Sequence, residues 1–277
     1  MLLGFHLSIS GSIDMAINRA NTIKCNTFQI FTSNPRGWQF TEIKEEHVDL
    51  FKKKCNEHNI KTPLVHMPYL PNLSSPKNEG YQKSIEILTS ELIRCNLLNI
   101  PYLVTHLGSH LGEGITFGLK RVINACSIAL SKADNNTMIL LENTAGTKNS
   151  TGSTFENLQF VLNNVKSKKI GICFDTAHAF AAGYDLRSKE DVQKTINLLD
   201  NIIGINKIKA IHLNDSKYIF NSHSDRHEHI GLGYIGENGF RSFLNHKISK
   251  NCSIILETPI DDRRDDVGNI KKVKELA

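Results

Sequence analysis

Short apolar runs alternate along the chain with longer stretches in which apolar residues recur every three or four positions. The short runs, rich in β-branched residues, predict strands at 2–6, 27–31, 62–66, 101–106, 138–142, 170–175, 208–213 and 253–257. The longer stretches have the helical period and predict helices at 12–23, 41–58, 80–98, 115–133, 154–166, 188–203, 239–248 and 266–276. The pattern therefore predicts eight strand-then-helix units.

Strands that are apolar almost throughout, and that helices connect, are typical of parallel sheets buried on both faces. Eight such units favour an α/β fold, a single (β/α)₈ or TIM barrel, which typically needs about 250 residues. The chain has 277 residues, so we expect one domain over 1–277. A doubly wound open sheet is the alternative architecture.

Composition narrows the class of protein. Hydrophobic residues make up 40% and charged residues 22%, which excludes a disordered chain. No apolar run is long enough to cross a membrane, and the first residues lack the basic start of a secretion signal. The six cysteines form no CxxC pair, so we expect reduced thiols in an intracellular, cytoplasmic protein. The net charge of +5 permits a polyanionic partner.

The last residues of the predicted strands are nearly all of one chemical kind. In chain order they are His6, Phe31, His66, His106, Glu142, Asp175, His212 and Glu257. The carboxyl ends of barrel strands meet at one face, where active sites lie. Imidazoles and carboxylates without thiolates suit Zn²⁺, Mn²⁺ or Fe²⁺. The pattern therefore predicts a metal site at the C-terminal face of the strands.

Two further clusters extend this set. His178 follows Asp175 by three residues, which is one turn if a helix has begun. Asp225 and His227 are two residues apart and would face one side of an extended loop. A solvated polar loop is the alternative for that second cluster, but the strand-end set favours ligands.

Residues 231–236, Gly-Leu-Gly-Tyr-Ile-Gly, match the GxGxxG pattern of dinucleotide sites. They follow Arg-His-Glu-His rather than a strand, and we expect no helix of ordinary length to begin at the third glycine. A tight loop that shapes the site is the favoured interpretation.

Six segments together resemble the endonuclease IV family of apurinic/apyrimidinic endonucleases. In chain order they are VTHLGSHL, LLENTAG, GICFDTAHAFAAGYDL, IHLNDSK, DRHEHIGLGYIG and IILETP. They occur in the family's order over essentially the whole chain. The resemblance implies a barrel with three Zn²⁺ ions, or Mn²⁺ or Fe²⁺ as substitutes. It also implies a monomeric DNA-repair enzyme that cuts duplex DNA 5′ to abasic sites, leaves a 3′-hydroxyl and a 5′-deoxyribose phosphate, and trims blocked 3′ ends.

The resemblance also assigns roles to individual residues. His66 and His106 would bind one zinc ion, with Glu142 as the catalytic bridge to a second. Asp175, His212 and Glu257 would complete the second site, and His178, Asp225 and His227 would bind the third ion. His6 and His110 are expected close to the site but not as ligands.

DNA contacts are expected from the loops that follow the second and third strands. The resemblance implies that Arg36, Tyr69 and Leu70 enter the minor groove while the abasic nucleotide is flipped out. Apolar wedges can open a base step in this way, and a nucleotide without a base is easily extruded. The alternative is that Tyr69 and Leu70 only pack their loop.

The sequence is compatible with two other functions. A sugar isomerase or epimerase of the xylose-isomerase-like barrel group would bind one metal through Glu142, Asp175, His212 and Glu257, and would leave the five other ligands unused. A DNA-binding module without catalysis is disfavoured, because phosphate contacts need Lys and Arg rather than converging acids.

Overall fold

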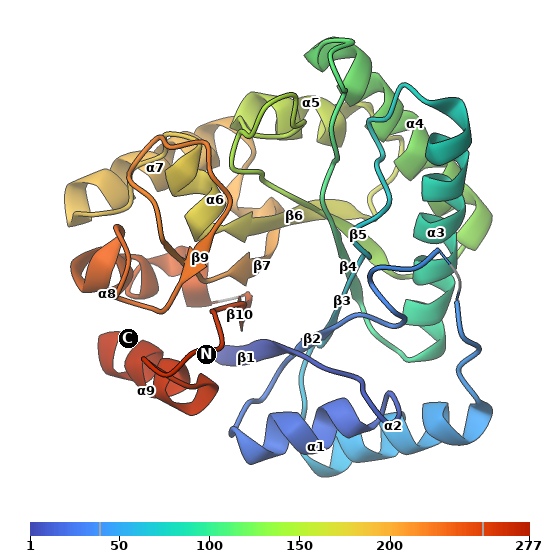
Figure 1. Ribbon diagram of the computed structural model, residues 1–277, viewed down its shortest axis with the longest axis horizontal. Coiled ribbons are helices and arrows are strands. Elements are labelled where there is room, and N and C mark those ends of the chain that lie inside the picture. Colours follow the sequence, from blue (N-terminus) through green and yellow to red (C-terminus); the bar gives the residue numbers. More distant parts are fainter. Residues whose placement is uncertain (39, 251) are drawn as a thin grey trace.

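The computed structural model describes residues 1–38, 40–250 and 252–277, and its centre is a closed barrel of parallel strands (Figure 1). The strands are β1 (Leu2–Leu7), β2 (Gln29–Ile30), β3 (Leu64–His66), β4 (Tyr102–Thr105), β5 (Met138–Glu142), β6 (Ile170–Asp175), β7 (Ile208–His212) and β10 (Ser253–Leu256). Strand β1 pairs with both β2 and β10, which closes the barrel. The predicted (β/α)₈ barrel is thus confirmed, and the open sheet is excluded.

Helices surround the barrel and cover the outer face of the strands (Figure 1). They are α1 (Met15–Thr22), α2 (Glu45–Glu57), α3 (Asn78–Leu97), α4 (Ile115–Ala133), α5 (Phe155–Asn164), α7 (Lys189–Ile202), α8 (Gly236–Leu244) and α9 (Asp266–Leu276). Each corresponds to a predicted helix. Helices α1 and α2 begin three and four residues later than predicted, because residues 12–14 and 41–44 belong to the preceding loops. Within the described ranges, no helix combines the length and the apolar character needed to cross a membrane.

The apolar residues of the strands face two separate cores. Alternate residues of six strands fill the barrel interior: Leu64, Val104, Leu140, Cys173, Ala210 and Ile255. The residues between them pack against the helices in a larger core outside the barrel. Burial on both faces explains why the strand sequences are apolar throughout rather than alternating.

The structure also contains elements that the periodicity did not predict. A short helix, α6 (Thr176–Ala181), follows β6 directly, and β8 (Asp215–Ser216) pairs antiparallel with β9 (His227–Glu228). Single-turn 3₁₀ helices occur at Ile205–Lys207 and Lys247–Lys250. All residues of α6 are buried, so this helix has no polar face that could reveal a helical period.

One expectation about the glycine-rich segment was wrong. Helix α8 begins at Gly236, the third glycine of the GxGxxG match, whereas we expected no helix there. Its first turn, Gly-Glu-Asn, contains no apolar residue. The helical pattern therefore becomes visible only from Gly239 and Phe240 onward, where the buried face begins.

Candidate metal centre

Six of the nine proposed ligands are placed by the period of the strands. Each follows, by two positions, a residue of the apolar barrel interior: His66, His106, Glu142, Asp175, His212 and Glu257. Side chains in a strand alternate between its two faces. The ligands are therefore the next inward-facing side chains, at the C-terminal face of the barrel and directly above its apolar filling.

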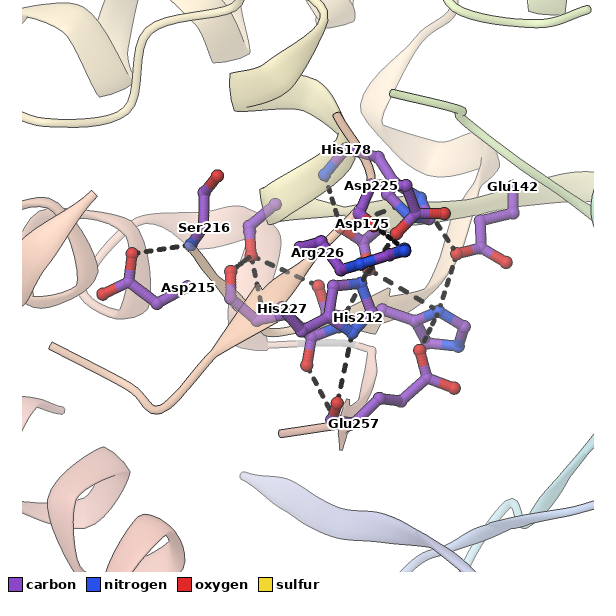
Figure 2. A network of polar contacts seen from close by, with 12 residues as sticks. Glu142, Asp175, His178, His212, Asp215, Ser216, Asp225, Arg226, His227 and Glu257 are labelled. Carbon is purple, nitrogen blue, oxygen red and sulfur yellow. Dashed lines mark hydrogen bonds and ion pairs between the residues drawn. The ribbon is translucent and has the colours of Figure 1, made fainter. Parts of the chain in front are cut away.

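The remaining three ligands come from segments beyond the strand ends. Asp175 caps the N-terminus of α6 by accepting a hydrogen bond from the backbone N–H of His178 at 2.7 Å. This cap turns His178 back over the barrel mouth. His227 lies in β9, and Asp225 precedes it in the connecting loop. Figure 2 shows these side chains pointing toward Glu142 and Asp175.

Within the described part of the chain, potential ligand atoms gather in three groups, each within 4.8 Å. The groups are His66, His106 and Glu142; Glu142, Asp175, His212 and Glu257; and Asp175, His178 and His227. Asp225 joins the last group, since its Oδ1 lies 3.1 Å from Nε2 of His178. The structure thus brings all nine proposed ligands together. Six of them line a cavity of about 340 Å³: His66, His106, His178, Asp225, His227 and Glu257.

The hydrogen bonds of the imidazoles determine which nitrogen faces the centre. In four rings one nitrogen donates to an oxygen that can only accept. The pairs are His66 Nδ1 to Met67 O (2.7 Å), His178 Nδ1 to Asn143 O (2.9 Å), His227 Nδ1 to Glu257 O (3.1 Å) and His212 Nε2 to Gln29 Oε1 (2.8 Å). In a neutral ring the other nitrogen then carries a lone pair. Those lone pairs face the carboxylates of the centre.

Lone pairs that face carboxylate oxygens repel them unless a proton or a cation lies between. Nε2 of His178 and Nε2 of His227 are buried and face Oδ1 of Asp225 at 3.1 Å and Oδ2 of Asp175 at 3.6 Å, yet neither makes an aligned hydrogen bond with any described residue. Rings oriented by an outer hydrogen bond, with a free nitrogen turned toward carboxylates, are typical of metal sites. The donor set, imidazole and carboxylate without thiolate, therefore fits Zn²⁺, Mn²⁺ or Fe²⁺.

Glu142 occupies the middle of the arrangement and belongs to two of the groups. Its Oε2 lies 3.1 Å from Nε2 of His66 and 3.0 Å from Nε2 of His106. Its Oε1 lies 3.0 Å from Nδ1 of His212. Each oxygen thus faces a different group, as a carboxylate that bridges two cations requires.

Electrostatics keep Glu142 and Asp225 ionised. Burial disfavours the charged form of Glu142, but the neighbouring imidazoles, His106 first, outweigh burial and hold its pKa well below the ordinary value. Burial likewise opposes charge on Asp225, and the adjacent His178 lowers the pKa of this carboxyl to about 2. For His66 burial dominates and lowers the pKa. For His178 the charge of Asp175 outweighs burial and holds the pKa well above its ordinary value.

Three amide side chains that the sequence analysis missed surround the centre. Asn214 donates to Asp175 at 2.8 Å, and Asn143 accepts the backbone N–H of Asp175 at 2.8 Å. Gln29 bridges Glu257 (2.8 Å) and His212. Asn143 and Asn214 lie one and two residues after predicted ligands, so a search beyond the strand ends could have found them. No local pattern marks Gln29.

The two histidines set aside as non-ligands have different surroundings. His6 lines the cavity, with its Nδ1 3.2 Å from Oε1 of Glu257. His110 is not among the residues that line the cavity. Its Nδ1 accepts the backbone N–H of Gly114, at 3.0 Å, just before α4.

The residues proposed for DNA contact, Arg36, Tyr69 and Leu70, lie on two adjoining loops beside the cavity, which we call the rim. Tyr69 lines the cavity, is 63% exposed, and packs edge-on against Phe31 with ring centroids 5.2 Å apart. Leu70 is 40% exposed and borders a neighbouring groove, and Arg36 is exposed. A backbone hydrogen bond of 3.1 Å from Tyr69 to Pro35 joins the two loops. Their role in DNA contact stays a prediction.

Comparisons with known proteins agree with this geometry. Residues 17–276 match the model of the xylose isomerase-like TIM barrel family. Probable endonuclease 4 from Methanoculleus marisnigri is 50% identical over 279 residues, which cover 100% of this chain and 99% of the relative. Endonuclease IV from Thermus thermophilus is 31% identical with a TM-score of 0.87, over 100% and 97% of the two chains. A D-tagatose 3-epimerase-like protein, 20% identical with a TM-score of 0.75 over 100% and 96%, shares the fold alone. The chain belongs to the endonuclease IV family of apurinic/apyrimidinic endonucleases, within the xylose isomerase-like TIM barrels.

Proposed function

We propose that this protein hydrolyses the phosphodiester bond on the 5′ side of abasic sites in duplex DNA, with three zinc ions held by the nine ligands. The products would be a 3′-hydroxyl and a 5′-deoxyribose phosphate, and blocked 3′ ends would be further substrates. We expect a monomer that acts on DNA inside the cell. The observation that carries the proposal is the convergence of nine imidazole and carboxylate side chains in one cluster at the C-terminal face of the barrel, six of them lining a cavity.

Divalent cations bound here would lower the pKa of water and offset the negative charge of the scissile phosphate. The protein's own contribution is to hold its donors in place before substrate arrives. Glu142 presents one oxygen to each of two ligand groups. The backbone carbonyls of Met67 and Asn143 fix the orientation of His66 and His178. Such preorganised charge is what slow phosphate hydrolysis needs.

The rim residues suit the recognition of a nucleotide without a base. Tyr69 stands at the edge of the cavity with most of its surface exposed, and Leu70 is its exposed neighbour. We expect them to fill the gap left in the base stack while the abasic nucleotide enters the cavity. Arg36, on the adjoining loop, would enter the minor groove together with them.

A single-metal sugar isomerase or epimerase is the alternative. It would use Glu142, Asp175, His212 and Glu257, which form one of the three groups. It gives no role to His66, His106, His178, Asp225 and His227. The likeness to an epimerase-like protein shows only the shared barrel.

Two measurements on the purified protein test the proposal. Elemental analysis should find three metal ions per chain, mainly zinc. Incubation with a labelled duplex that contains one abasic site should give a 5′ cut whose 3′ end a DNA polymerase can extend, and chelation should stop the reaction. One ion per chain and an intact abasic strand would favour the isomerase instead.

A further inference from the structure

Asp215 is a buried carboxylate outside the nine proposed ligands. It lies three residues after His212, at the start of β8, and its side chain is fully buried. Among the described residues, no Lys, Arg or His side chain forms an ion pair with it. Burial of an unpaired charge is costly unless hydrogen bonds compensate, so the partners of Asp215 indicate its role.

Those partners are backbone N–H groups of the glycine-rich segment 231–236. Oδ1 accepts from Ile235 at 2.9 Å, and Oδ2 accepts from Gly231 and Gly233 at 3.0 Å each and from Gly236 at 3.3 Å. A fifth N–H, of Ser216 at 2.8 Å, is visible in Figure 2. The segment thus forms the concave ring of N–H groups that binds anions in many proteins.

In dinucleotide sites a loop of this sequence holds a phosphate at a helix N-terminus. Here the carboxylate of Asp215 occupies the corresponding position, at the N-terminus of α8. The carboxylate packs directly against the segment, since a Cβ atom added at Gly233 would lie only 2.6 Å from Oδ1 of Asp215. The GxGxxG match is therefore explained without any nucleotide.

The glycine-rich segment is the end of the loop that carries Asp225 and His227. Strand β9 pairs Ser216 with His227, and Tyr234 donates a backbone hydrogen bond to Ser216 at 2.9 Å. Hydrogen bonds to β8 thus hold this loop at His227 and again at Tyr234. Unlike the six strand-end ligands, Asp225 and His227 lie outside the barrel strands. Their position depends on these contacts with β8 and on the hydrogen bond from Nδ1 of His227 to the carbonyl of Glu257.

We propose that Asp215 is a positioning residue of the third metal group: its carboxylate closes the 231–236 ring and so holds Asp225 and His227 against His178. Asp215 touches neither metal nor substrate in this role. The inference rests on the proposed metal centre, and its test is metal affinity, which does not depend on DNA cleavage.

The first experiment replaces Asp215 by Asn, because an amide nitrogen cannot accept the N–H groups on one side of the ring. Zinc content and affinity are measured by titration with a competing chelator. We expect Asp215→Asn to lose one ion per chain, with an affinity for that ion about 10- to 100-fold lower, as for other groups that orient ligands. Hydrogen exchange of the amides of 231–236 should accelerate.

The matched control is Asp14→Asn. Asp14 is also buried, and it pairs with Lys54 at 2.7 Å, away from the glycine-rich segment. This variant should lose stability but keep three ions. An Asp215→Asn protein that binds three ions with unchanged affinity would overturn the proposal.

A second pair of variants serves if Asp215→Asn does not fold. Gly236→Ala strains a residue at φ +74° that contributes to the ring, and Gly112→Ala strains one at φ +104° in another loop. An added Cβ meets nothing within 4 Å at either position. We expect weaker binding of one ion in Gly236→Ala only, and equal affinities in both would contradict the role of the ring. A wild-type protein that binds three ions but leaves abasic DNA intact would refute the proposed function and not this inference.

Discussion

The metal centre and the rim of the cavity are built in opposite ways. The innermost acids and rings extend from strand ends and are almost wholly buried, as Glu142 (1% exposed), Asp175 (0%) and His212 (0%) illustrate. Tyr69 and Leu70 lie on a loop and are exposed, at 63% and 40%. The difference indicates that the innermost proposed metal ligands are preorganised by rigid strands. The proposed recognition residues leave apolar surface free for a partner.

The rim is nevertheless anchored below its exposed side chains. Arg94, on α3, donates through Nε to the hydroxyl of Thr32 (2.6 Å) and through Nη2 to the carbonyl of Thr32 (2.6 Å). Its Nη1 donates to the carbonyl of Thr41 at 2.9 Å. Arg94 therefore holds both ends of the loop that carries the exposed Arg36.

The largest effect is expected from Glu142→Gln, which should impair the metal centre and leave DNA binding by the rim intact. A neutral amide cannot serve both ligand groups, so we expect the loss of at least one metal ion and nearly complete loss of incision. Binding of abasic duplex should largely survive, because the rim is unchanged. Metal analysis and a binding titration check this, with Glu91→Gln as a buried control that keeps all its metal. Normal incision with unchanged metal content would show that Glu142 is not a bridge.

The converse change is Tyr69→Ala combined with Leu70→Ala. All metal ions should remain, but the preference for abasic over intact duplex should fall by up to a few kcal/mol, the order of the cost of unstacking one base step. Both duplexes are titrated at one salt concentration, since phosphate contacts depend strongly on salt. Phe160→Ala, at an exposed apolar site on α5, is the control. An unchanged ratio of affinities would mean that the two side chains only pack their loop.

A smaller effect is expected from Glu91, which lies on α3 beneath the rim. Its Oε2 accepts a hydrogen bond from Thr32 at 2.7 Å, while its Oε1 is buried and has no hydrogen-bond partner among the described residues. Burial, opposed by the hydrogen bond from Thr32 and by the charge of Arg94, raises the pKa of Glu91 from 4.5 to about 7. The folded protein therefore binds this proton more tightly than the unfolded chain does.

The stability from this proton is complete below pH 4.5 and is lost as the pH rises through 7. From about pH 5 to about pH 8 the free energy of unfolding should fall by at most about 3 kcal/mol on account of Glu91. Urea unfolding of wild type and Glu91→Gln at both pH values measures this, because the variant lacks the titrating group. Equal pH dependence in the two proteins would exclude the effect.

The smallest effect should follow from Arg94→Lys. Lysine keeps the charge but cannot maintain all three hydrogen bonds to the loop, each of which is worth about 1 kcal/mol. We expect KM for abasic duplex to rise by up to about ten-fold, with kcat and metal content unchanged. Steady-state kinetics check this. A fall in kcat at constant KM would instead connect the loop to the metal centre.

The features that depend on local repetition in the sequence were predicted well. The alternation of apolar runs with helical stretches, and the recurring His, Asp and Glu at the strand ends, predicted the barrel and the face on which those side chains meet. Strand lengths were less accurate: 27–31 was predicted where β2 covers only Gln29–Ile30. The ends of short strands depend on pairing with neighbours rather than on their own residues.

Other features were decided only by the closed barrel. Gln29 contacts Glu257, 228 residues away in the sequence, because β1 lies between β2 and β10. Helix α8 starts at Gly236 after a segment whose N–H groups surround Asp215, although that segment matches the GxGxxG pattern and was expected to be only a tight loop. Periodicity is a property of neighbouring residues, so it can be recognised in the sequence. The partner of a buried polar group is determined by chain closure, which brings together residues that no local pattern connects.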